Sequence, residues 1–186
     1  MRNASNLELA LLGLLKQKPQ SGYDLRKTFG TTAMRHFSDS PGSIYPALRR
    51  MEARGWITSD GKPPNQSEDR RKRLVFHLTA EGESLLVAWL EQPVTRQGVI
   101  WQLPELMLRF AFMDGNVPRS TTRRFLAQLE QELASYAGEL RVQFERSLSE
   151  ISLNTGLLAF QSGVEGFEAQ LAWARQARAH LEENAP

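Results

Sequence analysis

The segment from residue 38 to residue 78 limits the fold of this 186-residue chain more than any other. A helix is expected to begin at Ser40, because a serine side chain accepts hydrogen bonds from the free N–H groups of a first helical turn. Three apolar side chains follow at spacings of four and three residues, which places them on one buried face: Ile44, Leu48 and Met51. The pattern predicts an amphipathic helix that continues to Arg54.

The residues after this helix change period. Gly55 favours the left-handed conformation that ends a helix, and two short runs, residues 56–58 and 74–78, are typical of strands. The tip between them is rich in Gly, Pro, Asn and charge. An amphipathic helix with a cationic outer face, followed by a hairpin with a basic tip, is the layout of a winged helix. In that fold the helix enters a major groove, and the hairpin reaches phosphate or the next groove.

Several side chains of this region are candidates for contact with DNA. Arg49 and Arg50 lie off the apolar stripe and are expected to face DNA, whereas Arg54 also stands where a cation opposes the helix dipole. Tyr45 is either a core aromatic or a group that binds phosphate. The alternatives are a plain three-helix bundle with solvated arginines and a charged, solubilising loop. The predicted DNA contacts are Tyr23, Ser40, Ser43, Tyr45, Arg49, Arg50, Lys62, Arg70, Arg71, Lys72 and Arg73.

Three motifs in this order resemble the PadR family of bacterial transcriptional regulators: Gly22-Tyr23-Asp24-Leu25, the run from Gly42 to Glu52, and Phe76-x-Leu78-Thr79-x-x-Gly82. The resemblance is close over residues 5–92. The chain departs from the family at Ser38, where Trp is usual, and at Phe76, where Tyr is common. The resemblance implies a DNA-binding winged helix, a C-terminal dimerisation domain with helices exchanged between subunits and, in many members, release by a ligand.

The distribution of charge supports two domains. The net charge is only +2, but residues 16–73 hold 13 Lys/Arg against 6 Asp/Glu, whereas residues 93–186 hold 9 Arg against 11 Asp/Glu. A basic first half and a slightly acidic second half suggest a domain that binds a polyanion and a domain that contacts protein. We therefore predict a winged-helix DNA-binding domain over residues 1–92 and an α-helical dimerisation domain over residues 93–186, with a linker over residues 93–99.

The rest of the first domain is expected to be helical. Ser5, with Glu8 three residues later, is a capping box for a first helix over residues 5–16. Ser21 opens a second helix with the same pattern, and Thr79 caps a fourth over residues 80–91. The predicted fold class is therefore mainly α, a winged helix-turn-helix with a three-helix core and a two-stranded wing.

The second half has the spacing of coiled coils. A short helix is expected over residues 104–113, followed by two long helices over residues 118–148 and 155–183, which form an antiparallel pair. Their apolar side chains recur at alternating steps of three and four residues. A monomeric bundle folded back on residues 100–113 is one alternative, and a homodimer is the preferred one. The predicted dimer interface is Leu126, Leu129, Leu133, Tyr136, Leu157, Phe160, Val164, Phe167 and Leu171.

Aromatic side chains around the second domain suggest a pocket for a small, flat effector. Aromatics at helical spacing also form ordinary cores, so both interpretations stand. The candidate pocket residues are Trp89, Trp101, Phe110, Phe112 and Trp173.

The sequence offers no catalytic, metal-binding or cofactor-binding motif. It has no Cys, and its three His residues are far apart, with no H-E-x-x-H, Walker or G-x-G-x-x-G pattern. The apolar run from Leu9 to Leu15 is too short to span a bilayer, and a cytoplasmic protein is expected. The preferred function is a sequence-specific DNA-binding repressor, a homodimer on a palindromic operator that a small aromatic ligand releases. The alternative is a protein-interaction or ligand-sensing module with little DNA binding.

Overall fold

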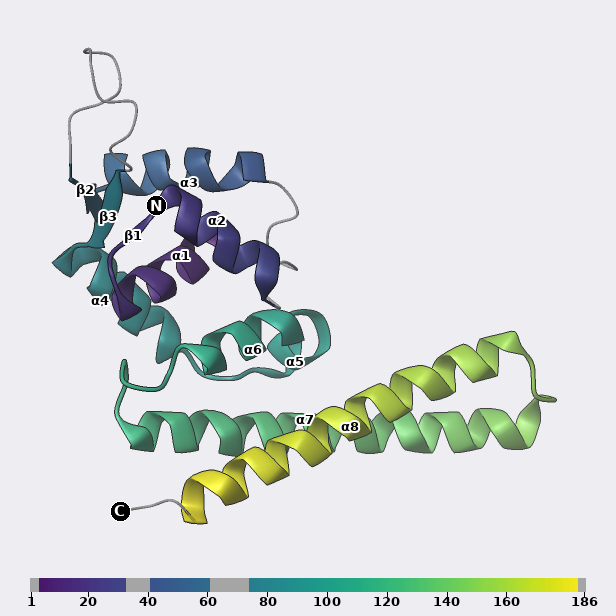
Figure 1. The fold of residues 1–186 in the computed structure, drawn as a ribbon. Helices are drawn as coiled ribbons and strands as arrows, with labels where there is room; N and C mark the ends of the chain where they lie inside the picture. The colour runs from purple at the N-terminus through teal and green to yellow at the C-terminus, as the bar shows by residue number, and fades with distance from the viewer. Residues whose placement is uncertain (1–3, 33–40, 61–73, 184–186) are drawn as a thin grey trace. The chain divides into compact units, whose positions relative to one another are not determined.

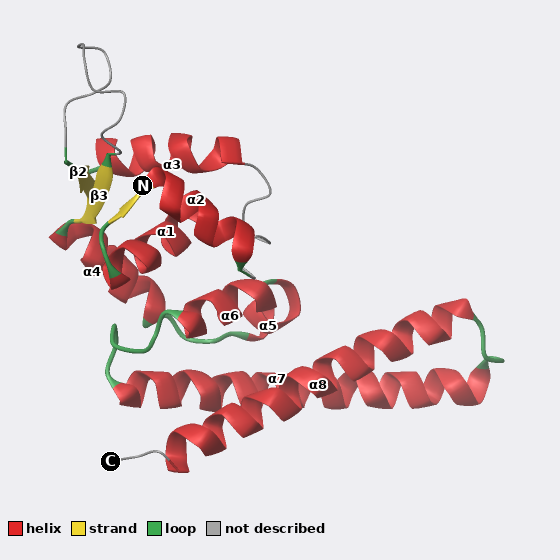
Figure 2. Ribbon diagram, viewed as in Figure 1, coloured by secondary structure: helices red, strands yellow, loops and turns green. Residues whose placement is uncertain are grey.

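The computed structural model describes residues 4–32, 41–60 and 74–183. The chain divides into two compact units, Met1–Leu90 and Glu91–Pro186. The predicted boundary, after residue 92, lies two residues farther along the chain. Helices dominate both units, and the one sheet of the described residues lies in the first (Figures 1 and 2). The prediction of a mainly α fold is confirmed.

The N-terminal unit contains a three-stranded antiparallel sheet among helices. Its elements are α1 (Asn6–Gln17), β1 (Gln20–Ser21), α2 (Gly22–Thr31), α3 (Pro41–Ala53), β2 (Ile57–Ser59), β3 (Val75–Leu78) and α4 (Ala80–Leu90). The strand order is β1-β3-β2, with Ser21 opposite Val75 and Ile57 opposite Leu78. The predicted two-stranded wing corresponds to β2 and β3. The third strand, β1, was not predicted, because it has only two residues and shows no alternation.

Local capping signals determine where these helices begin and end. The Glu8 backbone N–H donates to Ser5 Oγ at 3.3 Å, and the Ser5 N–H donates to Glu8 Oε2 at 2.9 Å, which completes the predicted capping box. At α2, the Asp24 N–H donates to Ser21 Oγ at 3.2 Å. Gly55, with φ of 72°, adopts the predicted left-handed conformation after α3.

The core of the N-terminal unit forms around α1, which packs against α3, α4 and β3. The predicted stripe of α3 is buried as expected. Each such side chain removes apolar surface from water, which stabilises the fold by about 1.5–3 kcal/mol for a Leu, Ile or Met. The most deeply buried side chains here are Leu11, Leu12, Leu25, Phe29, Ile44, Leu48, Met51, Ile57, Leu86 and Leu90.

The Thr79-x-x-Gly82 motif fastens α4 to the turn between α3 and β2. The Thr79 hydroxyl donates to the Gly55 carbonyl at 2.6 Å and accepts from the Gly82 N–H at 3.1 Å. Gly82 lies so close to this turn that a Cβ atom would stand 2.1 Å from the carbonyl oxygen of Trp56. Only a residue without a side chain allows this approach.

The substitution Gly82→Ala should therefore destabilise the protein by about 3 kcal/mol or more, because the clash is with backbone rather than with a flexible side chain. The measurement is the urea unfolding midpoint followed by circular dichroism. Gly30→Ala on α2 is the matched control, since its Cβ would meet nothing within 4 Å. An unchanged midpoint for Gly82→Ala would contradict this close packing.

The C-terminal unit is helical throughout its described residues. It contains α5 (Arg96–Trp101), α6 (Leu103–Ala111), α7 (Arg119–Glu150) and α8 (Thr155–Glu183). The prediction of a linker over residues 93–99 was wrong, because α5 begins at Arg96. Thr95 caps this helix by accepting from the Gly98 N–H at 3.1 Å. Pro93 and Gly98 suggested a linker, and the six-residue helix is too short for its period to outweigh them.

The seam between α7 and α8 closes within one chain. Leu126, Leu129, Leu133 and Val164 are completely buried, and the Tyr136 and Phe167 rings meet edge to face at 4.8 Å. A spacing of three and four residues serves a helix pair inside one chain as well as one between chains. Of the side chains assigned to the dimer interface, Tyr136 and Phe167 meet between the two helices of one chain, and Phe160 packs with Leu157 and Val164 in a cluster that includes Phe144 of α7. The assignment of these side chains to a contact between subunits stays a prediction.

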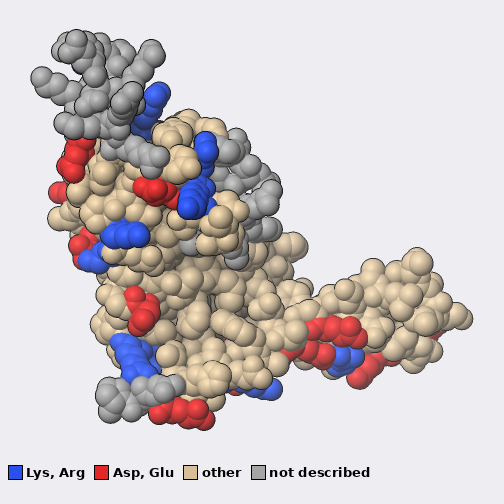
Figure 3. All heavy atoms as spheres, viewed as in Figure 1, with Lys and Arg blue, Asp and Glu red and all other residues tan. Residues whose placement is uncertain are grey.

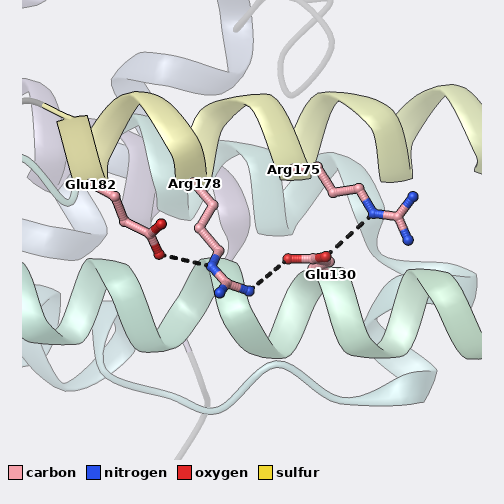
Figure 4. A network of polar contacts seen from close by, with 4 residues as sticks. All are labelled: Glu130, Arg175, Arg178 and Glu182. Carbon is pink, nitrogen blue, oxygen red and sulfur yellow. Dashed lines mark hydrogen bonds and ion pairs between the residues drawn. The ribbon is translucent and has the colours of Figure 1, made fainter.

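Charged side chains bridge the same seam. Glu130 on α7 accepts from Arg175 at 3.3 Å and from Arg178 at 2.9 Å, and Arg178 also binds Glu182 on its own helix (Figure 4). Farther along the seam, Arg141 Nε donates to Glu168 Oε1 at 2.9 Å. Exposed pairs of this kind contribute little stability each. Their consequence is a defined register of α8 along α7.

Candidate nucleic-acid interface

The outer face of α3 is the centre of the candidate interface. Gly42, Pro46, Arg49 and Ala53 follow one another at spacings of four, three and four residues, and all four are exposed. They lie opposite the buried stripe of Ile44, Leu48 and Met51. We call these four residues the outward line of α3. The other three carry no charge and no long side chain, so Arg49 is the charged group of this line.

Tyr45 lies beside this face. It has features of both predicted roles, a core aromatic and an exposed group that binds phosphate. Its side chain is 43% exposed, yet its ring packs over the start of α2. A Cβ atom at Gly22 would stand 2.7 Å from Tyr45 Cε1, so the Gly22-Tyr23 motif provides the space that the ring occupies. Tyr23 is also exposed, and the Arg26 guanidinium lies 5.5 Å from its ring centre.

Arg50 and Arg54, on the flank of α3, both contact Glu8 of α1. Arg50 Nε donates to Glu8 Oε1 at 3.0 Å, and Arg54 Nη1 lies 3.6 Å from Glu8 Oε2. The Arg54 guanidinium also lies 4.7 Å from the ring centre of Trp56. Glu8 is only 2% exposed. This cluster joins residues more than 40 positions apart, and no local sequence signal indicates it.

The Glu8 carboxyl is ionised in this environment. Burial raises its pKa, but the hydrogen bonds from the Ser5 N–H and from Arg50, with the positive charges of Arg50 and Arg54, outweigh burial. The net effect lowers the pKa of Glu8 below its ordinary value of 4.5. The buried negative charge of Glu8 therefore faces the guanidinium groups of Arg50 and Arg54.

The other predicted contacts fall in two groups. Ser43 lies in the first turns of α3 and is half-buried. Ser40 and the basic residues of the hairpin tip lie outside the described residues: Lys62, Arg70, Arg71, Lys72 and Arg73. On the face of the molecule in Figure 3, basic and acidic side chains of the described residues are interspersed rather than joined in one basic patch.

The candidate pocket residues do not form one set. Phe110 meets Trp173 edge to face at 5.5 Å and stacks on Phe125 at 5.9 Å. Phe125 was not among the candidates, because its contact with Phe110 joins two different helices and no local signal indicates it. Phe112 is buried, whereas Trp101 is 80% exposed. Trp89 belongs to α4 of the N-terminal unit, where it is buried.

A buried cation lies at the edge of this aromatic cluster. Arg109 on α6 donates from Nη2 to the Gln92 carbonyl at 2.7 Å, and its guanidinium is 5.0 Å from the Phe125 ring centre. Burial lowers the pKa of Arg109. Its Nε has no hydrogen-bond partner within the described part of the chain. The contact with Gln92 ties α6 to the first residues of the C-terminal unit.

Comparison with known proteins agrees with the helix and motifs described above. Residues 11–88 match the transcriptional regulator PadR-like family. These residues of the chain are similar to that family, and the match includes α3, β2 and β3. A curated protein similar to this chain is the negative transcriptional regulator PadR of Bacillus subtilis (strain 168), 27% identical over 145 residues, which are 77% of this chain and 75% of that protein.

Solved structures of PadR proteins are similar to this chain along most of its length. Bacillus subtilis PadR in complex with operator DNA is 21% identical, with 94% of this chain and 98% of that chain covered, at a TM-score of 0.41. The same protein in complex with p-coumaric acid is 20% identical, with 99% of each chain covered, at a TM-score of 0.40. In the described residues, no helix has the length and apolar character needed to cross a membrane.

The lowered pKa of Glu8 predicts a pH dependence of stability. The folded pKa lies below the unfolded one, so the carboxylate's contribution is complete above the unfolded value and is lost as pH falls through the folded value. Between about pH 5 and pH 2, the unfolding midpoint should fall more steeply for the native protein than for Glu8→Gln. Glu83→Gln, which removes an exposed carboxylate paired with Lys16, should keep the steep fall. Parallel curves for native protein and Glu8→Gln would contradict the assignment.

Proposed function

We propose that this PadR-like chain is a sequence-specific DNA-binding transcriptional regulator and that α3 enters the major groove. The observation that carries the proposal is the outward line of α3, where Arg49 is exposed among small residues and opposite a buried stripe. An arginine in that position can donate two hydrogen bonds to the O6 and N7 atoms of a guanine. The family match covers this helix.

The other candidate contacts position the protein on the duplex. The Tyr45 ring is held against Gly22 with part of its surface exposed, which suits its hydroxyl to a phosphate. Tyr23, Ser40, Ser43, Lys62 and the run Arg70–Arg73 are assigned to the sugar-phosphate backbone. Contacts of that kind fix the register of a protein on DNA and carry no base information by themselves.

We further propose that the protein is a repressor that a small aromatic effector releases. The assignment as repressor is supported by the curated relative, which is named a negative transcriptional regulator. The effector assignment is supported by the aromatic cluster of Phe110, Phe125 and Trp173. The protein acts by binding and not by catalysis. It is located in the cytoplasm, where the chromosome also lies.

The first test is recovery of fragmented genomic DNA by the purified protein at two salt concentrations, followed by sequencing. The expected result is a few palindromic sites that are lost at high salt, since each phosphate contact adds to the salt dependence. Uniform recovery or none would favour the rival function, a protein-interaction or ligand-sensing module with little DNA binding.

At a site recovered in this way, Arg49→Ala should weaken binding by about 1–3 kcal/mol, because a base contact is lost. On an unrelated duplex the same substitution should have a much smaller effect. Fluorescence anisotropy with both duplexes measures the two affinities. Arg123→Ala, on the exposed surface of α7, is the control and should change neither. Equal weakening on both duplexes would show that Arg49 binds phosphate.

A dimer is part of the proposal, because proteins of this kind read two half-sites with two subunits. α7 and α8 pack against each other within one chain, but Phe160, Phe167 and Leu171 remain partly exposed, so the predicted interface residues stay candidates. Exposed apolar side chains gather around the turn that joins the two helices, and we propose that a second copy of the chain covers them: Val142, Leu148, Ile151, Leu153 and Leu158.

Leu153→Asp should therefore weaken self-association by roughly tenfold or more, because a charge replaces a side chain that association buries. Sedimentation velocity over a range of concentrations measures the effect. Ala169→Asp places the same charge on an exposed position of α8 away from the turn and should leave the dimer intact. Equal association of both variants and the native protein would contradict the assignment of this surface.

A further inference from the structure

Arg49 and Arg50, in the C-terminal half of α3, and Arg54, in the turn that follows it, differ in their surroundings. Arg50 and Arg54 both contact the buried carboxylate of Glu8, whereas Arg49 lies on the outward line and, within the described residues, forms no ion pair. Glu8 belongs to α1, the helix around which the core of the N-terminal unit forms. A charge fixed in the core therefore acts on two of the three cations of the candidate recognition helix.

We propose that Glu8 is a specificity-determining positioning residue of the DNA interface. It anchors Arg50 and Arg54 beside the outer face of α3 and offsets one of their two positive charges, so that Arg49 is the guanidinium of α3 that reads bases. The proposal rests on the proposed function. It also revises the expectation that Arg50 faces DNA as Arg49 does.

The physical basis is the difference between specific and non-specific binding. Non-specific affinity comes almost entirely from cations that neutralise phosphates, and specificity is the ratio of the two affinities. Two unpaired arginines on the flank of α3 would add phosphate contacts on any sequence. Pairing them with Glu8 lowers the non-specific affinity and leaves the contact of Arg49 with a base unchanged.

The geometry makes this arrangement stable. A buried carboxylate is costly unless hydrogen bonds and opposite charges surround it. Glu8 has both, since Oε1 accepts from Arg50 Nε and Oε2 accepts from the Ser5 N–H while facing Arg54. Arg54 is held a second time by the ring of Trp56. Arg50 remains 51% exposed, so it lies close to DNA once Glu8 no longer holds it.

Glu8 also caps α1, and the experiment must separate this role from the effect of its charge. A glutamine at this position of a capping box accepts the same backbone hydrogen bond. Glu8→Gln therefore keeps the cap and the side-chain shape and removes only the negative charge. The thermal unfolding midpoint and circular dichroism of the variant confirm that it is folded.

The experiment measures the affinity of the full-length protein for a recovered operator and for an unrelated duplex over a series of salt concentrations. For Glu8→Gln, non-specific affinity should rise by about tenfold at low salt, and its logarithmic salt slope should steepen by about 0.9 for each new phosphate contact. Specificity should fall by about the same factor. The triple variant Glu8→Gln, Arg50→Gln, Arg54→Gln should bring the slope back toward that of the native protein.

Two controls separate the release of Arg50 and Arg54 from the simple loss of one negative charge. Glu83→Gln removes one negative charge from the same unit without releasing an arginine of α3, and it should steepen the slope less. Arg50→Gln in the presence of Glu8 should reduce the affinity for the operator less than Arg49→Gln does, because Arg49 contacts a base, and this comparison decides the matter if Glu8→Gln does not fold. A Glu8→Gln slope equal to that of the native protein, or equal losses from the two arginine variants, would overturn the proposal. A native protein that binds no duplex at low salt would instead overturn the proposed function.

Discussion

The burial of α1 is the interaction on which the N-terminal unit depends. Its leucines fill the space between α3, α4 and β3, and this hydrophobic contact fixes where the outer face of α3 lies. The same burial places Glu8 inside the protein, where a carboxylate is stable only with donors and cations around it. Arg50 and Arg54 meet that requirement from α3. The packing that builds the core thus also determines which charges remain on the surface that meets DNA.

The two units use their arginines differently. In the C-terminal unit, Arg96, Arg141, Arg175 and Arg178 all bind glutamates of neighbouring helices or turns. These four positive charges of the C-terminal half are therefore used for contacts within the fold. On α3 the outward line holds Arg49 instead. Net charge alone, at +2 for the chain, hides this difference between cations that support structure and cations on an open face.

Local signals were sufficient to predict most elements but not their long-range contacts. The cap at Ser5, the left-handed Gly55 and the buried stripe of α3 were predicted because each depends on residues within one or two helical turns. β1 was not predicted, because its two residues form a strand only by pairing with β3, more than 50 positions away. The contact between Glu8 and Arg50 was missed for the same reason. The spacing in α7 and α8 predicted a helix seam, yet spacing cannot state whether one chain or two chains form it.

The cross-seam pairs of α7 and α8 have a mechanical consequence. The bonds of Glu130 to Arg175 and Arg178 are 2.9–3.3 Å long, whereas a slide of one helix past the other by one turn is about 5.4 Å. Such a slide would break the pairs of Glu130 and Arg141 together and would also part the rings of Tyr136 and Phe167. These contacts therefore oppose a slide of α8 along α7, and the two helices keep their register.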